Sequence, residues 1–236
     1  MGHRREVSRV EGFSDAVFAF AITLLVVSLE VPKTYHELMT AIRGFPTFAV
    51  CFALLFQVWW RHYRFFRTYD LEDTYVIAWT GVLLFVVLFY VYPLKFLWSV
   101  AFSPIEGRRI TDAIITTAQV PALFTIYGAG VIAVFSILAL LHRHAYRLRD
   151  RLELSPETVL DTRERICSNI GVASVGALSI AVALLCQQFA PNLIGVAGYV
   201  YCLIGVVEWR IGVHHGHERE KLREPIAVSR EDTSLA

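Results

Sequence analysis

Six long runs of apolar residues constrain this sequence more than any other feature. They cover residues 13–31, 45–60, 75–98, 114–141, 170–189 and 193–209. A helix that crosses the hydrocarbon core of a bilayer needs about 20 mostly apolar residues. With 56% hydrophobic residues and a mean hydropathy of +0.51, the chain carries more apolar surface than one soluble core of 236 residues can bury. We therefore predict an all-α integral membrane protein with six transmembrane helices per subunit.

Basic residues in the connections indicate how these helices cross the membrane, because Lys and Arg in short loops stay on the cytoplasmic side. In the predicted topology 17 of the 22 basic residues fall on one side, and the other side receives Lys33, Arg43, Lys95, Arg108 and Arg109. We therefore expect a multi-pass protein of the inner (plasma) membrane with both termini in the cytoplasm, which an even number of spans fits.

The first run has an alternative interpretation as a cleavable signal peptide, with Arg4 and Arg5 as its basic region. Asp15 interrupts the start of that apolar stretch, however, and no A-x-A cleavage site follows it. The transmembrane interpretation is preferred for this reason.

The polar segments divide the chain into a membrane domain, residues 1–211, and a polar cytoplasmic tail, residues 212–236. The tail lacks apolar periodicity and is expected to fray. The longest connection, residues 142–169, contains Ser155-Pro156-Glu157, a helix-start signal with Pro at the first helical position. A short cytoplasmic helix is predicted there.

Several function classes find little support. A net charge of +1 provides no concentrated basic face, so nucleic acid is not expected as a partner. The four cysteines lack C-x-x-C spacing, and a histidine tract in a polar tail lacks the supporting groups that fix a metal site. No nucleophile, base and orienting group recur together, so we expect neither an enzyme nor a cofactor. The four cysteines are Cys51, Cys167, Cys186 and Cys202, and the histidine tract consists of His214, His215 and His217.

Asp15 is an acid near the start of the first predicted helix. A charged side chain costs about 2.5 to 3.5 kcal/mol at the bilayer centre and less near the interface, so it normally has a partner or faces water. One interpretation is a solvated helix-start residue favoured by the helix dipole. The other is a buried acid that needs hydrogen-bond donors.

The surrounding residues favour the second interpretation. Arg9-x-x-x-Phe13-Ser14-Asp15, followed by an Ala-rich apolar helix, resembles the motif of the transmembrane protein 175 family of potassium channels. That family also shows W-x-x-H followed by an aromatic residue in the second helix, and Trp59 and His62 occupy these places. The resemblance covers about the first hundred residues; from the fourth run onward it rests on span count and charge pattern.

The resemblance implies a homotetramer in which the first helix of each subunit lines a central pore that is permeable to potassium ions and modestly selective. The chain has no T-V-G-Y-G sequence, so a carbonyl filter of that type is not available. The family's apolar constriction instead carries over to Phe20, Leu24 and Val27, with Thr23 as a nearby hydroxyl. These positions share one stripe of a helix. Relatives usually have Ile or Leu where Phe20 stands, and the alternative is that the stripe serves only helix packing.

The resemblance also implies that Arg9 and Asp15 join Trp59 and His62 in a network that holds the pore helix. Guanidinium, indole and imidazole groups supply the donors that a buried carboxylate needs. Two alternatives remain. Arg61, His62 and Arg64 could simply mark the cytoplasmic interface, with Trp59 and Trp60 in the aromatic belt. Alternatively, Asp15 and His62 could carry protons in a proton-coupled secondary transporter. A membrane scaffold without transport is a third class of function.

Overall fold

The computed structural model describes residues 8–27, 32–102, 119–190 and 195–216, and every regular element in these ranges is helical. The elements are α1 (Arg9–Val27), α2 (Tyr35–Arg43), α3 (Phe45–Tyr69), α4 (Thr74–Ala101), α5 (Val120–Arg147), α6 (Pro156–Phe189), α7 (Val196–Tyr199) and the 3-10 turn η4 (Val200–Cys202). The chain stays helical after η4, so that Val196–Gly216 forms one segment, which we call the C-terminal helix.

Four of these segments are long and apolar enough to cross a membrane: α4, α5, α6 and the C-terminal helix. A fifth is the pair α2 and α3, which are bent by 42° at Gly44. α1 is not in this group, and its first two turns carry Arg9, Glu11 and Asp15. The prediction of a helical multi-pass membrane protein is therefore confirmed, whereas length and composition alone select four or five of the six predicted spans.

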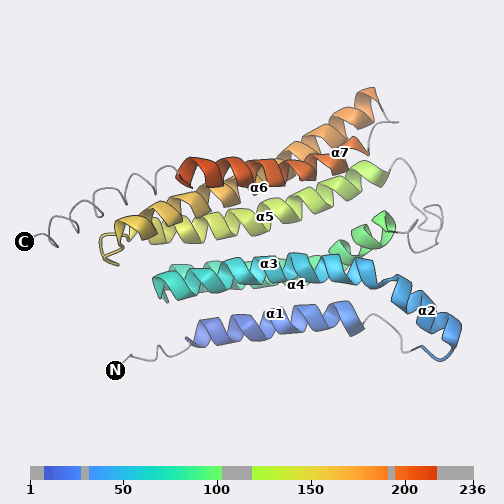
Figure 1. The fold of residues 1–236 in the computed structure, drawn as a ribbon, viewed down its shortest axis with the longest axis horizontal. Helices are drawn as coiled ribbons and strands as arrows, with labels where there is room; N and C mark the ends of the chain where they lie inside the picture. The colour runs from blue at the N-terminus through green and yellow to red at the C-terminus, as the bar shows by residue number, and fades with distance from the viewer. Residues whose placement is uncertain (1–7, 28–31, 103–118, 191–194, 217–236) are drawn as a thin grey trace, which may run out of the picture.

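The long helices lie roughly along one direction in a bundle (Figure 1). α1 packs against α3 and α4, α4 and α3 connect this group to α5, and α5 and α6 form the most extensive helix pair. The start of α1, the α3–α4 and α5–α6 connections and the end of the C-terminal helix lie at one end of the bundle (Figure 1). The topology predicted from the basic residues requires these segments to lie on the same side of the membrane.

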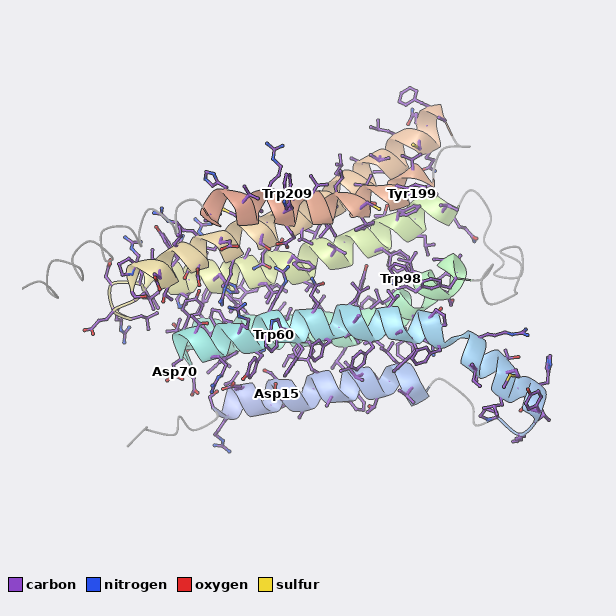
Figure 2. The ribbon with its side chains drawn as sticks, in the orientation of Figure 1. Asp15, Trp60, Asp70, Trp98, Tyr199 and Trp209 are labelled. Carbon is purple, nitrogen blue, oxygen red and sulfur yellow. The ribbon has the colours of Figure 1, made fainter. Side chains whose placement is uncertain are left out.

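The core runs along the bundle between the two groups of helices. α1 contributes Phe18, Ala21 and Leu25, and the other buried side chains include Phe65, Phe66, Leu83, Val87, Leu138 and Leu141. Large apolar side chains also point outward, among them Tyr199 and Trp209 of the C-terminal helix, which are 76% and 69% exposed (Figure 2). Outward apolar side chains of this size suit lipid as the surrounding solvent.

Several predicted boundaries differ from the structure, and three of the differences lie at the polar ends of the helices. α3 continues to Tyr69, beyond the predicted end at residue 60. Ser155 caps α6 as its sequence indicates, accepting a hydrogen bond from the Thr158 amide at 3.2 Å, but no separate short helix follows. No proline interrupts residues 157–189, so the cytoplasmic turns continue directly into the membrane run. The C-terminal helix likewise extends to Gly216, into the predicted tail, whose residues 217–236 lie outside the described part.

Candidate pore helix and its supporting contacts

α1 starts at a hydrogen-bonded cap and presents a small polar residue to the core. The Ser8 hydroxyl accepts a hydrogen bond from the Glu11 amide at 3.1 Å, which satisfies one free amide of the first turn. Ser14 is completely buried, and its hydroxyl donates to the Val10 carbonyl at 2.7 Å. The motif serine therefore allows close packing without leaving a buried hydroxyl unpaired.

One face of α1 is buried within the subunit, and it carries Glu11, Ser14, Phe18, Ala21 and Leu25. The alternating spacing of three and four residues places these side chains on a single stripe of the helix. This stripe faces α3 and α4, which both pack against α1.

The opposite face is uncovered by any described part of the same chain. Phe13 and Phe20 are 64% and 55% exposed, and Ala16 and Thr23 lie beside them on the same face. Leu24 lies at the border, half-buried against the core. Val27 is the last described residue of α1. The structure thus separates Phe20 and Thr23 from the packing face.

The Thr23 hydroxyl donates a hydrogen bond to the Phe20 carbonyl at 2.7 Å. A hydroxyl has one donor and two lone pairs, so this bond uses the proton and leaves the oxygen able to accept. An oxygen of this kind can coordinate a cation.

The two sequence motifs meet between α1 and α3. The Trp59 indole Nε1 donates to Asp15 Oδ1 at 2.7 Å. The Trp59 ring is held in turn by Phe56 and Tyr63, with ring centroids 5.1 and 5.3 Å away. Asp15 therefore has a fixed donor that anchors the start of α1 to α3.

His62 and Arg9 do not complete the expected network. His62 is buried, lies 3.5 Å from the Thr80 hydroxyl and contacts the ring of Phe18 at 5.8 Å. It therefore supports the middle of α1 from behind rather than binding Asp15. Arg9 is exposed at the start of α1, and within the described ranges no hydrogen bond or ion pair joins it to Asp15, Trp59 or His62.

The other end of α1 has a cationic contact that the sequence reasoning missed. The ammonium of Lys95, from α4, donates to the Leu25 carbonyl at 3.2 Å. A positive charge near the carboxyl end of a helix stabilises the helix dipole. The signal in the sequence was a lysine inside an apolar run, which entered the prediction only as a residue of the non-cytoplasmic side.

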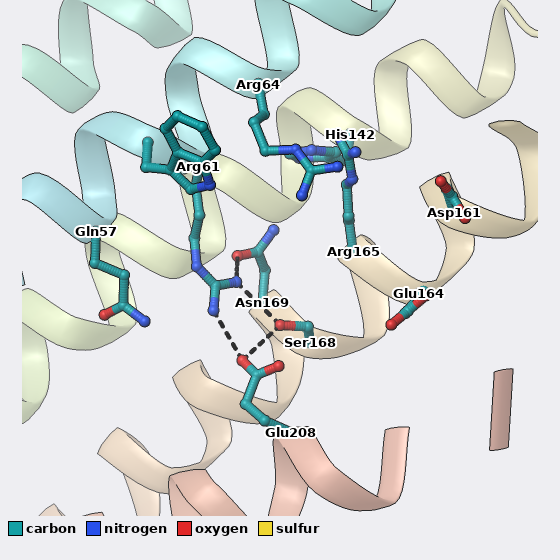
Figure 3. A pocket seen from close by; sticks show the side chains of 11 residues that line it. Gln57, Arg61, Arg64, His142, Asp161, Glu164, Arg165, Ser168, Asn169 and Glu208 are labelled. Atoms are coloured by element: carbon teal, nitrogen blue, oxygen red, sulfur yellow. Dashed lines mark hydrogen bonds and ion pairs between the residues drawn. The ribbon is translucent and has the colours of Figure 1, made fainter. Parts of the chain in front are cut away.

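Arg61 and Glu208 form a second contact that the sequence analysis does not predict. The Arg61 guanidinium lies 2.8 Å from Glu208 Oε1, and it donates to Ser168 and Asn169 at 3.0 Å each (Figure 3). Ser168 also donates to Glu208 at 2.7 Å. We call these four residues the Arg61 cluster; it connects α3, α6 and the C-terminal helix.

The histidine tract is partly described. His214 and His215 lie in the C-terminal helix, where His215 Nδ1 is 3.0 Å from the Ile211 carbonyl, and His217 lies outside the described residues. Among the residues that are described, no group of three or more His, Cys, Asp or Glu side chains is arranged to hold a metal ion.

Comparison with known proteins agrees with the motif residues. Residues 9–90 match the family model for the endosomal/lysosomal potassium channel TMEM175. Over 206 residues the chain is 38% identical to a potassium channel of Marivirga tractuosa, an alignment that covers 84% of this chain and 83% of the relative. The chain belongs to the TMEM175 family.

A further relative and a solved structure are also similar to this chain. A potassium channel of Chamaesiphon minutus is 33% identical over 107 residues, which cover 42% of this chain and 53% of that one. The crystal structure of a single-residue variant of the potassium channel MtTMEM175 superposes with a TM-score of 0.79 at 32% identity, covering 92% of this chain and 97% of the other. The TMEM175 model ends at residue 90, so it includes Asp15, Trp59 and His62 but neither Lys95 nor the partners of Arg61.

Proposed function

We propose that this chain is a subunit of a potassium-permeable channel in which α1 lines the conduction path. The observation that carries the proposal is the uncovered face of α1. Phe13, Ala16, Phe20 and Thr23 share that face, away from every described helix of the subunit. Membership of the TMEM175 family, with relatives that are named potassium channels, supports potassium as the permeant ion.

The proposed assembly is a homotetramer of six-span subunits, with α1 as the first span and the C-terminal helix as the last. Rotation about a four-fold axis would bring the uncovered faces of four α1 helices together. The covered face, with Phe18, Ala21 and Leu25, would stay against α3 and α4 of its own subunit. The coverage of the MtTMEM175 structure supports a shared subunit architecture.

The proposed constriction consists of rings of Phe20, Leu24 and Val27, with Thr23 oxygens between the first two. An apolar ring discriminates between ions by the cost of removing their water, so we expect potassium to pass more readily than sodium by a modest factor. Four Phe20 rings would also offer aromatic faces to a passing cation. The Thr23 oxygen retains the lone pairs to assist, because its proton is used within the helix.

The proposed orientation places the end with the α3–α4 and α5–α6 connections in the cytoplasm, in the inner (plasma) membrane. Arg64 and Arg67 of α3, Arg143 and Arg147 of α5 and Arg163 of α6 lie toward this end, close to those connections. The positive-inside preference supports this direction.

A proton-coupled transporter is the other function considered from the sequence, and no observation favours it. Asp15 is bonded to an indole, which does not relay protons at ordinary pH, and His62 faces Thr80 and Phe18. In the described residues, Asp15 and His62 are therefore not joined into one relay.

Ion flux from liposomes containing the purified protein tests the proposal. We expect potassium flux that exceeds sodium flux and needs no proton gradient, and that changes in rate or selectivity in F20A and L24A. Phe85, on the exposed face of α4, gives the matched control F85A, which should behave as wild type. Flux that requires a proton gradient, or F20A and L24A variants identical to F85A, would contradict the proposal.

A further inference from the structure

A polar pocket lies between α3, α5, α6 and the C-terminal helix, away from α1. Its volume is about 310 Å³, within the usual range for a site that holds a small molecule. The Arg61 cluster forms one side of it, and there the charges of Arg61 and Glu208 compensate each other. The other side holds Arg64, His142 and Arg165, with Asp161 and Glu164 nearby (Figure 3).

His142 is the feature that points to a ligand. Its side chain is 1% exposed, and its Nδ1 lies 2.8 Å from the Leu138 carbonyl. Because a carbonyl only accepts, Nδ1 must carry the hydrogen, so Nε2 of the neutral ring is an acceptor. His142 lines the pocket, and its Nε2 has no partner among the described residues. A buried acceptor without a partner is unfavourable, so a group that donates to Nε2 from within the pocket would be stabilised.

Two guanidinium groups lie on the same side of the pocket. Figure 3 shows Arg64 and Arg165 extending toward His142 from α3 and α6, and their positive charges are close enough to repel each other. Arg165 donates to the Thr68 hydroxyl at 3.3 Å, whereas the Arg64 guanidinium has no hydrogen bond or ion pair within the described ranges. Arginine binds phosphate and carboxylate oxygens through paired N–H groups, so this side of the pocket is suited to an anion.

The nearby acids do not remove this preference. Asp161 and Glu164 project from α6 beside Arg165 (Figure 3), and both carboxylates interact electrostatically with its guanidinium. By count these two acids balance Arg64 and Arg165, so an anion would be held by directional hydrogen bonds from the guanidinium groups rather than by a net positive charge. Neither carboxylate can donate to Nε2 of His142 while it is ionised.

The combination of two guanidinium donors and one buried acceptor selects among anions. A carboxylate or a sulfate is fully ionised near neutral pH and has only acceptor oxygens. A phosphate monoester has a second pKa of about 6, so near neutral pH it is mostly a dianion, but it holds a further proton more readily than a carboxylate or a sulfate does. We propose that this pocket binds a phosphate monoester group, with Arg64 and Arg165 holding the anionic oxygens and one proton shared between a phosphate oxygen and His142 Nε2.

The phosphate monoester could come from a small cytoplasmic molecule or from the headgroup of phosphatidic acid. Two sets of measurements distinguish these sources. Inorganic phosphate is titrated into the channel in nanodiscs of phosphatidylcholine, with sulfate as the matched anion, and binding is measured by calorimetry. Binding of phosphatidic acid is measured by native mass spectrometry of the channel from mixed vesicles, with phosphatidylglycerol, a phosphate diester, as the matched lipid.

The variants are paired so that each pair removes one arginine from α3 and one from α6. R64Q/R165Q changes the pocket. R67Q/R163Q is the control, because Arg67 lies over the Tyr63 ring and Arg163 donates to the Tyr146 hydroxyl at 2.6 Å, both outside the pocket. R64Q alone is a second pocket variant that is expected to fold. Within the described ranges the Arg64 guanidinium makes no hydrogen bond, so its removal costs the fold no such bond.

We expect wild type to bind phosphate more tightly than sulfate, or phosphatidic acid more tightly than phosphatidylglycerol. R64Q/R165Q should bind about tenfold or more weakly, as loss of a charge-assisted hydrogen bond predicts, and R64Q should show a smaller loss. R67Q/R163Q should bind as wild type does. Equal binding of the matched probes, equal losses in both double variants, or no binding of either phosphate or phosphatidic acid would overturn the proposal.

Discussion

The two halves of this subunit are held together in different ways. In the first half, α1 packs through a single stripe and is fixed at separate points, by the Asp15–Trp59 bond near its start and by Lys95 near its end. In the second half, α5 and α6 form the most extensive helix pair, with a close backbone approach at Gly128. Under the proposed function α1 leaves one face free for ions and can be held only from behind, whereas the α5–α6 pair can use its whole length.

Forcing α5 and α6 apart should have the largest effect on the stability of the subunit. A Cβ at Gly128 would lie 2.4 Å from Ile180 Cγ1 and 2.9 Å from the Gly176 carbonyl. We expect G128A to lower the free energy of unfolding by about 1 to 3 kcal/mol, as overpacking of a close-packed core does. Thermal unfolding in detergent measures this.

The matched control for this variant is G81A in α4, where an added Cβ meets nothing within 4 Å. It should gain about 1 kcal/mol, since alanine is the better helix former. A G128A variant as stable as G81A would show that the α5–α6 pair is less tightly packed than described.

The Arg61 cluster is one polar tie between the halves, beside bonds such as that of His144 to Asp73, and its loss should have the second largest effect on stability. R61M would leave Glu208 and Asn169 without the guanidinium. We expect a loss of about 2 kcal/mol, reduced from the value for a fully buried pair because both side chains are partly exposed. R67M is the matched control. A double-mutant cycle with E208L, if it gave no coupling energy, would show that the tie does not stabilise the subunit.

A smaller effect is expected at the Asp15–Trp59 bond, which holds α1 against α3. W59F keeps the aromatic contacts but removes the indole N–H that donates to Asp15. Loss of one such bond should cost about 1 kcal/mol of stability and change the rate of potassium flux, because Asp15 would no longer be held against α3. W60F changes an exposed neighbour that makes no bond to Asp15. If the two variants gave the same flux, the Asp15–Trp59 bond would not position α1.

The smallest expected effect concerns pH. Asp73 caps α4, accepting from the Val76 amide at 2.9 Å and bonding His144 at 2.6 Å. Partial burial raises the pKa of this carboxyl, but the bonds from His144 and Val76 outweigh it and leave the pKa below the ordinary 3.8. The stability that Asp73 contributes is therefore present above that ordinary value and is lost as pH falls through the lower folded pKa.

The check is the melting temperature of wild type and D73N from neutral pH downward. The difference between them should be small at neutral pH, because the Asp73 side chain is partly exposed, and it should vanish in acid. A difference that grows as the pH falls would contradict the assigned sign.

The sequence predicts the architecture well where the signal is local. Apolar runs of membrane length mark the spans. The Phe13-Ser14-Asp15 motif, together with Trp59 and His62, identifies where α1 contacts α3. Boundaries were missed where polar residues continue a helix beyond the membrane, as at Tyr69 and in the first turns of α6.

Long-range polar contacts were not predictable in the same way. Arg61 and Glu208 each resemble an ordinary interface residue, and only the packing of α3 against α6 and the C-terminal helix shows that they pair. His62 was expected to bind Asp15 because the motif groups them, but its position on α3 turns it toward Thr80. A charged residue inside an apolar run, as at Lys95, is the local signal that could have indicated a partner.

Cysteine modification tests the proposal that the uncovered face of α1 lines the conduction path. F20C and T23C are made with the exposed Cys167 and Cys202 changed to Ser, and potassium flux is measured before and after a water-soluble thiol reagent. We predict block at positions 20 and 23 and none in F85C, whose side chain is also exposed but lies on α4. Unchanged flux after modification of F20C and T23C, or equal block in F85C, would contradict the claim.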